Sequence, residues 1–132
     1  MRRIYPIIAV ALLALSLFLL GNNNQKDRVQ SPIKIGAVLS LTGYASAYGD
    51  QARKAIELAA DDLNRDGGIN GRTVEVIVED DQTDGKVATT AFRKLVDADH
   101  VQGVIGSMWD FVTEPLLSLA LENKVILITP TN

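Results

Sequence analysis

The strongest constraint on the fold is a regular alternation, after Pro32, between short apolar segments and longer segments with helical periodicity. The apolar segments are rich in branched side chains, which favour buried strands. They comprise residues 33–39, 73–79, 101–105 and 125–129. Strands separated by helices pair in parallel through right-handed connections. The pattern therefore predicts an open parallel α/β sheet with helices on both faces.

Amphipathic helices are expected between these strands. The first spans residues 52–63 and ends before Gly67, because glycine accepts the left-handed conformation at a helix C-terminus. The second covers residues 87–95. The third covers residues 116–121, and we expect Pro115 in its first turn, where a missing N–H is tolerated.

The predicted strand order is 2-1-3-4, as in flavodoxin-like and Rossmann-like sheets. Ligands of such sheets bind beyond the carboxyl ends of the strands, at the point where the strand order reverses. In this chain that crevice lies between the first and third strands. The loops at residues 41–48 and 107–110 open into it, and the loop after the fourth strand lies beside them.

The first residues have the pattern of an export signal or a membrane anchor. Arg2 and Arg3 precede the uncharged apolar residues 4–20, and such positive charge directs the following chain outward. A buried core helix is the alternative, but the segment is apolar on all sides and adjoins a polar stretch. No cysteine is available to carry a lipid. We expect a signal or anchor at residues 1–21, a polar linker at 22–32 and a ligand-binding unit at 33–132.

The charge distribution excludes one class of partner. Two of the 13 basic residues lie within residues 1–21, whereas all 16 acidic residues lie beyond them. The remaining chain is acidic and lacks the clustered Lys and Arg that sequence-independent nucleic-acid binding requires. The absence of cysteine also excludes disulfides and thiolate metal sites.

Motifs that would bring a cofactor, a metal or a catalytic group are incomplete. Residues 67–73 approach a phosphate-binding loop but have one residue too few between the glycines. Residues 80–85 resemble the start of a calcium loop, but Ala91 stands where its bidentate acid is required. The only histidine, His100, is expected at the opposite edge of the sheet, so Ser107 has no triad partner. We expect no cofactor, no metal and no enzymatic activity.

An ordered series of short motifs is similar to that of the branched-chain amino-acid binding proteins of ABC transporters, which are type 1 periplasmic binding proteins. The resemblance covers essentially everything after the linker. Its motifs are IKIG (33–36), LTG (41–43), YG (48–49), DLN (62–64), GGINGR (67–72), EDD (79–81), RKLV (93–96), VIG (104–106) and ITP (128–130).

The resemblance implies a two-lobed protein that closes on its ligand by domain motion. Residues 33–132 would form most of the first lobe, and we expect the second lobe and the hinge strands to lie outside this chain. It also implies a protein outside the cytoplasmic membrane that delivers a small solute to an ABC permease. A ligand-binding sensor domain of a membrane receptor is the alternative, since such domains share the fold.

The resemblance also implies ligand contacts. Tyr48 corresponds to an aromatic residue that packs on the ligand, and Thr131 begins the contributing loop after the fourth strand. The small hydroxyl residue of the third loop is replaced by Asp110, with Ser107 and Trp109 close by. Two alternatives remain open: Tyr48 closes over the core, and Asp110 caps the third helix.

The carboxylate of Asp110 changes the expected ligand. It would attract an ammonium group, and Trp109 would add an aromatic face for a cation. It would repel a ligand carboxylate unless helix-terminal N–H groups compensate. We therefore expect an amino acid, an amide or another small polar metabolite.

Overall fold

The computed structural model describes residues 30–130, so the predicted export segment lies outside the described residues. Within that range no helix has the length and apolar character needed to cross a membrane. The elements are β1 (Ile33–Leu39), α2 (Ser46–Arg65), β2 (Val74–Asp80), α3 (Gly85–Arg93), the π-helical turn η2 (Lys94–Ala98), β3 (Gly103–Gly106), α4 (Asp110–Asn123) and β4 (Ile126–Ile128).

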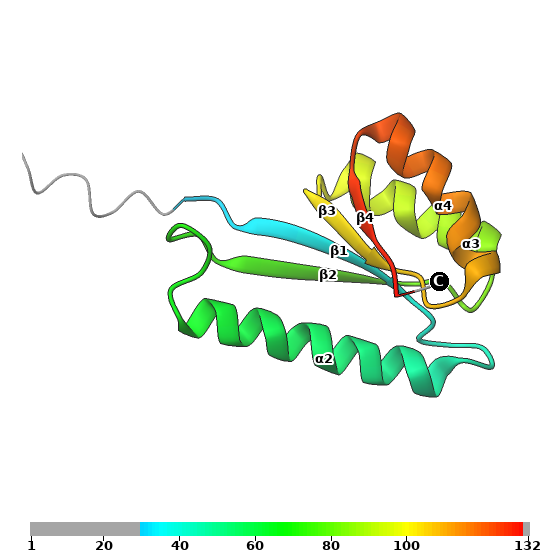
Figure 1. The fold of residues 1–132 in the computed structure, drawn as a ribbon, viewed down its shortest axis with the longest axis horizontal. Helices are drawn as coiled ribbons and strands as arrows, with labels where there is room; N and C mark the ends of the chain where they lie inside the picture. The colour runs from blue at the N-terminus through cyan, green and yellow to red at the C-terminus, as the bar shows by residue number, and fades with distance from the viewer. Residues whose placement is uncertain (1–29, 131–132) are drawn as a thin grey trace, which may run out of the picture. The chain divides into compact units, whose positions relative to one another are not determined.

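The sheet confirms the predicted strand order. Its neighbours run β2-β1-β3-β4, and every pair is parallel. Ala37 at the centre of β1 aligns with Val78 of β2 on one side and Ile105 of β3 on the other. The carboxyl ends of β1 and β3 therefore meet at one edge of the sheet (Figure 1).

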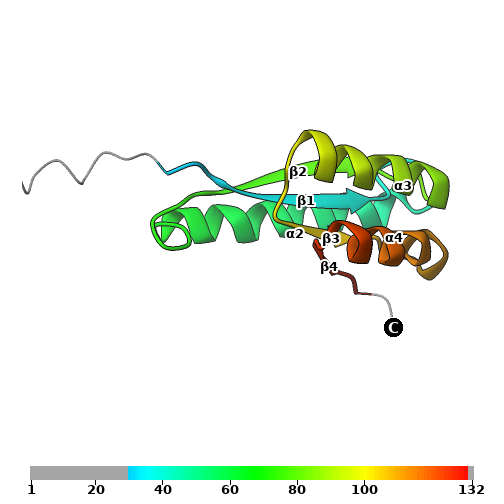
Figure 2. The same ribbon diagram turned by 90° about the horizontal axis from the view of Figure 1, so that it is seen from above.

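The helices are divided unequally between the two faces of the sheet. Helix α2 covers one face, whereas α3 and α4 lie side by side on the other (Figures 1 and 2). The connection from β1 to β2 crosses the sheet in one direction, and the later connections cross it in the opposite direction. Right-handed crossovers in opposite directions fall on opposite faces, so the strand order itself produces the division.

The α3–α4 face carries the core of the unit. Its central residues retain at most 1% of their exposure: Val38, Phe92, Leu95, Val104, Val112 and Leu116. The turn η2 packs so closely on β1 that a Cβ at Gly36 would lie 2.9 Å from Cδ1 of Leu95. This face is therefore filled by side chains from strands, helices and η2 together.

The α2 face is apolar but only partly covered. Helix α2 packs against β1 and β2, and Ala55 and Ile56 line hollows that reach Ile105 of β3. At the edge strand β4, Ile126 and Ile128 retain 67% and 62% of their exposure. The uncovered area therefore lies over β3 and β4.

Two expected boundaries were wrong. The predicted loop at 41–48 includes the first turn of α2, so Tyr48 is helical. Helix α4 begins at Asp110, which makes Pro115 its sixth residue and places it beyond the first turn. Pro115 cannot donate to the carbonyl of Phe111. That oxygen lies against α3, where a Cβ at Gly85 would come within 3.1 Å of it.

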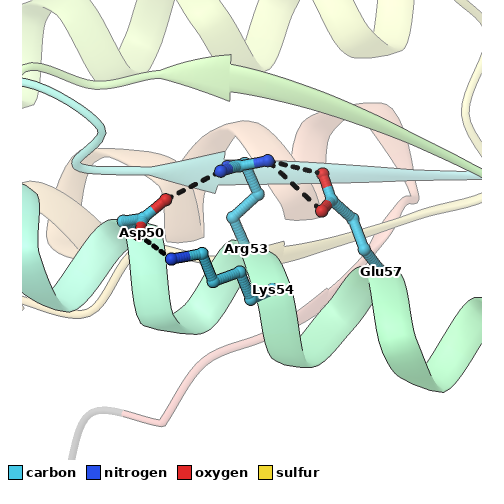
Figure 3. Close-up of polar contacts among 4 residues, drawn as sticks. All are labelled: Asp50, Arg53, Lys54 and Glu57. Atoms are coloured by element: carbon cyan, nitrogen blue, oxygen red, sulfur yellow. Dashed lines mark hydrogen bonds and ion pairs between the residues drawn. The ribbon is translucent and has the colours of Figure 1, made fainter.

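The polar surface of α2 carries a chain of ion pairs (Figure 3). Arg53 contacts Asp50 at 2.7 Å and Glu57 at 3.0 Å, and Lys54 also pairs with Asp50. Hydrogen bonds from Lys54 and then Arg53 lower the pKa of Asp50. These groups are accessible to water, where such pairs contribute little to stability.

Candidate ligand-binding site

The loop after β1 is held by one carboxylate at the end of β2. Oδ1 of Asp80 accepts the N–H groups of Leu41 at 2.9 Å and Thr42 at 3.1 Å, and Oδ2 accepts the Thr42 hydroxyl at 2.6 Å. Burial acts to raise the pKa of Asp80, but donors from Thr42, Gln82 and Leu41 outweigh it and lower the pKa. Asp80 is therefore a charged clamp on this loop.

The turn after β2 also packs against the loop after β1 and hydrogen-bonds to it. Gly43 has a φ of +83°, and a Cβ there would lie 2.6 Å from the carbonyl oxygen of Gln82. Thr83 has a φ of +59°, an unusual conformation for a β-branched residue. Its hydroxyl donates to the carbonyl of Thr42 at 3.3 Å. The first loop thus packs closely on the second.

The loop after β3 is anchored by buried polar groups. The hydroxyl of Ser107 donates to Oδ2 of Asp81 at 2.8 Å, and both side chains are fully buried. The carbonyl of Ser107 accepts the hydroxyls of Thr113 at 3.1 Å and Thr129 at 2.8 Å. These bonds join β2, β3, α4 and the end of β4, so they fix the position of the residues that follow Ser107.

Three aromatic side chains gather at the switch point: Tyr44 from the first loop, Tyr48 from the first turn of α2 and Trp109 from the third loop. The ring centroids of Tyr44 and Trp109 are 6.0 Å apart at an interplanar angle of 51°. Those of Tyr48 and Trp109 are also 6.0 Å apart, at 87°. Tyr44 and Tyr48 are exposed, and Trp109 is half-buried. We call Tyr44, Tyr48 and Trp109 the aromatic cluster.

Asp110 follows the aromatic cluster directly as the first residue of α4. The N-terminus of α4 has no side-chain capping hydrogen bond, so the alternative that Asp110 serves as the cap was wrong. Its side chain is exposed, in a favourable place for a negative charge beside the helix N-terminus. The carboxylate of Asp110 accepts no hydrogen bond from any other residue in the range 30–130.

The predicted site residues thus fall into three groups. Tyr48, Trp109 and Asp110 lie at the switch point and are open to water. Ser107 lies beneath them with its hydroxyl proton committed to Asp81. Thr131 lies outside the described residues.

Sequence reasoning missed three residues of this edge: Tyr44, Asp80 and Asp81. Tyr44 lies within the predicted ligand loop, and its aromatic character was the signal available for it. The two acids were considered only as the start of an incomplete calcium loop, because sequence alone does not reveal that they accept hydrogen bonds from loops after other strands.

The part of the chain that the structure describes contains no group of three metal-binding side chains close enough to hold an ion. His100 is exposed, in the turn before β3, at the amino end of that strand. It therefore lies at the edge of the sheet opposite the aromatic cluster.

A parallel sheet with loops converging at its switch point defines the class of open α/β folds that bind ligands at that edge. The comparison with family models identifies that class more closely, because the periplasmic binding protein model matches residues 32–132. The chain belongs to this family.

Known relatives agree with the family assignment. The Leu/Ile/Val-binding protein BraC3 of Rhizobium johnstonii is 36% identical over 99 residues, which cover 75% of this chain and 27% of BraC3. The Leu/Ile/Val-binding protein of Escherichia coli is 33% identical over 98 residues, covering 74% of this chain and 26% of that protein. The chain therefore spans about a quarter of the length of these relatives.

Solved structures give the same result for the fold. The branched-chain amino acid transporter substrate-binding protein LivJ from Streptococcus pneumoniae, in complex with isoleucine, matches with a TM-score of 0.73 and 32% identity. The match covers 76% of this chain and 29% of LivJ. The partial-lobe architecture expected from the resemblance is thereby confirmed.

Proposed function

We propose that this chain forms part of a solute-binding protein that captures an amino acid or similar small polar metabolite outside the cytoplasmic membrane. The protein delivers that ligand to an ABC permease. One observation carries the proposal: in a member of this family, Tyr48 of α2 contacts Trp109 at the switch point, and Asp110 follows Trp109 directly as the first residue of α4.

The relatives support a binding role. They are named as binding proteins for leucine, isoleucine and valine, and LivJ is named as a transporter component. These names favour transport over the receptor alternative. Export through residues 1–21, with a linker at 22–32 and the binding unit from residue 33, completes the proposal.

We assign different roles to the site residues. Tyr48, Trp109 and Asp110 contact the ligand, and Thr131 contributes from the loop after β4. Ser107 acts as a positioning residue, because its hydroxyl and carbonyl hold the loop in place while its side chain is buried.

The test is a nuclear magnetic resonance titration of the isotope-labelled chain with the common L-amino acids and their amides. A ligand is expected to shift the amide signals of residues 41–48 and 107–110. Tyr48→Ala should weaken that response, whereas Leu121→Ala, an exposed change late in α4, should not. Shifts confined to the uncovered apolar face would contradict the proposed site.

The transport role needs a cellular measurement. Deletion of the gene in its source organism should reduce uptake of the labelled ligand identified in that titration, and a plasmid copy should restore it. Unchanged uptake would count against an importer. Mass spectrometry of the exported protein would locate its mature N-terminus.

A further inference from the structure

The geometry points to a ligand with a permanently charged, N-methylated ammonium group, bound between the aromatic cluster and Asp110. This inference rests on the proposed function, since it names the ligand class of the same site. It goes beyond the relatives, whose names specify leucine, isoleucine and valine.

The first support is the arrangement of the rings. An aromatic face attracts a cation within about 6 Å of its centroid. Tyr44 and Tyr48 each lie 6.0 Å from Trp109, so a cation seated beside Trp109 and one tyrosine can lie within about 6 Å of both ring centroids. Because the rings meet at 51° and 87°, neither tyrosine stacks flat on the indole and masks a whole face.

The orientation of Trp109 supplies the second support. Its Nε1 atom is buried and has no hydrogen-bond partner among residues 30–130. The polar edge of the indole therefore points inward, and the exposed part of this half-buried residue is carbon surface. A ligand that approaches the indole from solvent meets carbon surface without a hydrogen-bond donor, and an aromatic ring attracts a cation through its face.

The charge of the edge is the third support. Residues 40–48, 80–84 and 107–110 contain no Lys or Arg. Three other acids of this edge already accept hydrogen bonds within the protein. The carboxylate of Asp80 accepts from the first loop, that of Asp81 accepts from Ser107 and Thr83, and that of Asp84 accepts from N–H groups at the N-terminus of α3. Asp110 is the acid of this edge whose carboxylate remains available to a ligand.

The number of N–H donors on the ligand favours a methylated cation over a primary ammonium. A primary ammonium has three N–H donors, and each loses a water molecule on binding unless it finds an acceptor. Within residues 30–130, the ring faces accept weakly, and Asp110 is the available carboxylate of this edge for those donors. A quaternary ammonium has no N–H donors, and its methyl groups contact the rings while Asp110 balances the charge.

The experiment uses Trp109, the only tryptophan in the 132-residue chain, as a fluorescence reporter. The chain is titrated with choline, with its uncharged carbon isostere 3,3-dimethylbutan-1-ol, and with L-leucine, at constant ionic strength. Choline should bind about five- to tenfold more tightly than the isostere, as cation–π attraction at a partly open site predicts.

Variants identify the groups responsible. Tyr44→Leu and Asp110→Asn should each reduce the preference for choline over the isostere to within about twofold. Tyr44→Phe keeps the ring and should keep the preference. Phe111→Leu and Glu114→Gln are the matched controls, because they change an exposed ring and an exposed acid of α4 outside the proposed contacts.

Each result decides the question. Binding of leucine with no preference for choline over its isostere would overturn the inference and leave the solute-binding function in place. No response to any of the three compounds would overturn the inference, whereas the solute-binding function is decided by the titration with the common L-amino acids and their amides. A choline preference that survives both Tyr44→Leu and Asp110→Asn would overturn the assignment to this cluster.

Discussion

Val104 and Ile128 lie on adjacent strands of one sheet, yet Val104 retains 1% of its exposure and Ile128 retains 62%. Val104 faces α3 and α4, whereas Ile128 lines the hollow on the α2 face. Both residues are β-branched and apolar. The difference shows that the direction of the crossovers, rather than the apolar character of a strand, decides which face of this sheet is covered.

The largest effect is expected from removing the ring at the centre of the packed face. Phe92→Ala should lower the free energy of unfolding by about 3–5 kcal/mol, because a fully buried ring leaves a cavity. Denaturant unfolding measures the change. Phe111→Ala removes the same side chain from a 53% exposed position and should cost less than about 1 kcal/mol. Equal losses of unfolding free energy in the two variants would contradict the conclusion that Phe92 is packed in the core and Phe111 is not.

The next largest loss of stability is expected at the edge of the sheet formed by the carboxyl ends of the strands. Asp81→Ala should cost about 1–3 kcal/mol, because the buried hydroxyl of Ser107 loses its acceptor. Thermal or denaturant unfolding would measure it. Asp97→Ala, at an exposed acid of η2, is the control. If both changes were neutral, Asp81 would not anchor the third loop.

A smaller effect is expected on the uncovered face. Ile128→Ala should cost less than about 1 kcal/mol, since most of this side chain already contacts water. Val104→Ala is the comparison on the packed face. Should the two variants unfold alike, the α2 face would be covered in solution, and sedimentation velocity would show whether a second copy covers it.

Acid should weaken the clamp on the first loop. The folded-state pKa of Asp80 is lowered below its value in the unfolded chain, which is about 3.9. Its contribution is therefore complete above about pH 4 and is lost as the pH falls through the folded-state pKa. Near-ultraviolet circular dichroism of the aromatic cluster should report that loss. Asp80→Asn should reduce this pH dependence.

The smallest effect is expected on the polar side of α2. Arg53→Ala removes the central cation of the exposed ion pairs, and its effect on the unfolding midpoint should be the least of the five. Raising the salt concentration should reduce even that difference, because salt screens exposed charges. A larger effect than that of Ile128→Ala would show that α2 is held mainly by charge.

The strands and their order were predictable because branched residues and helical spacing recur at regular intervals. The early start of α4 was not, since Pro115 was expected in the first turn of the helix but is its sixth residue. At the site, Tyr48, Trp109 and Asp110 were predicted as neighbours. The inward turn of Ser107 depends on Asp81, 26 residues earlier in the chain, and such a long-range bond leaves no local pattern.

The clamp formed by Asp80 also has a kinetic consequence. A loop that is already ordered before a ligand arrives loses little conformational entropy on binding. Under the proposed function, ligand encounter would require no slow rearrangement of the residues after β1, which Asp80 holds through three hydrogen bonds to Leu41 and Thr42. Asp80→Asn should consequently slow association more than it speeds release.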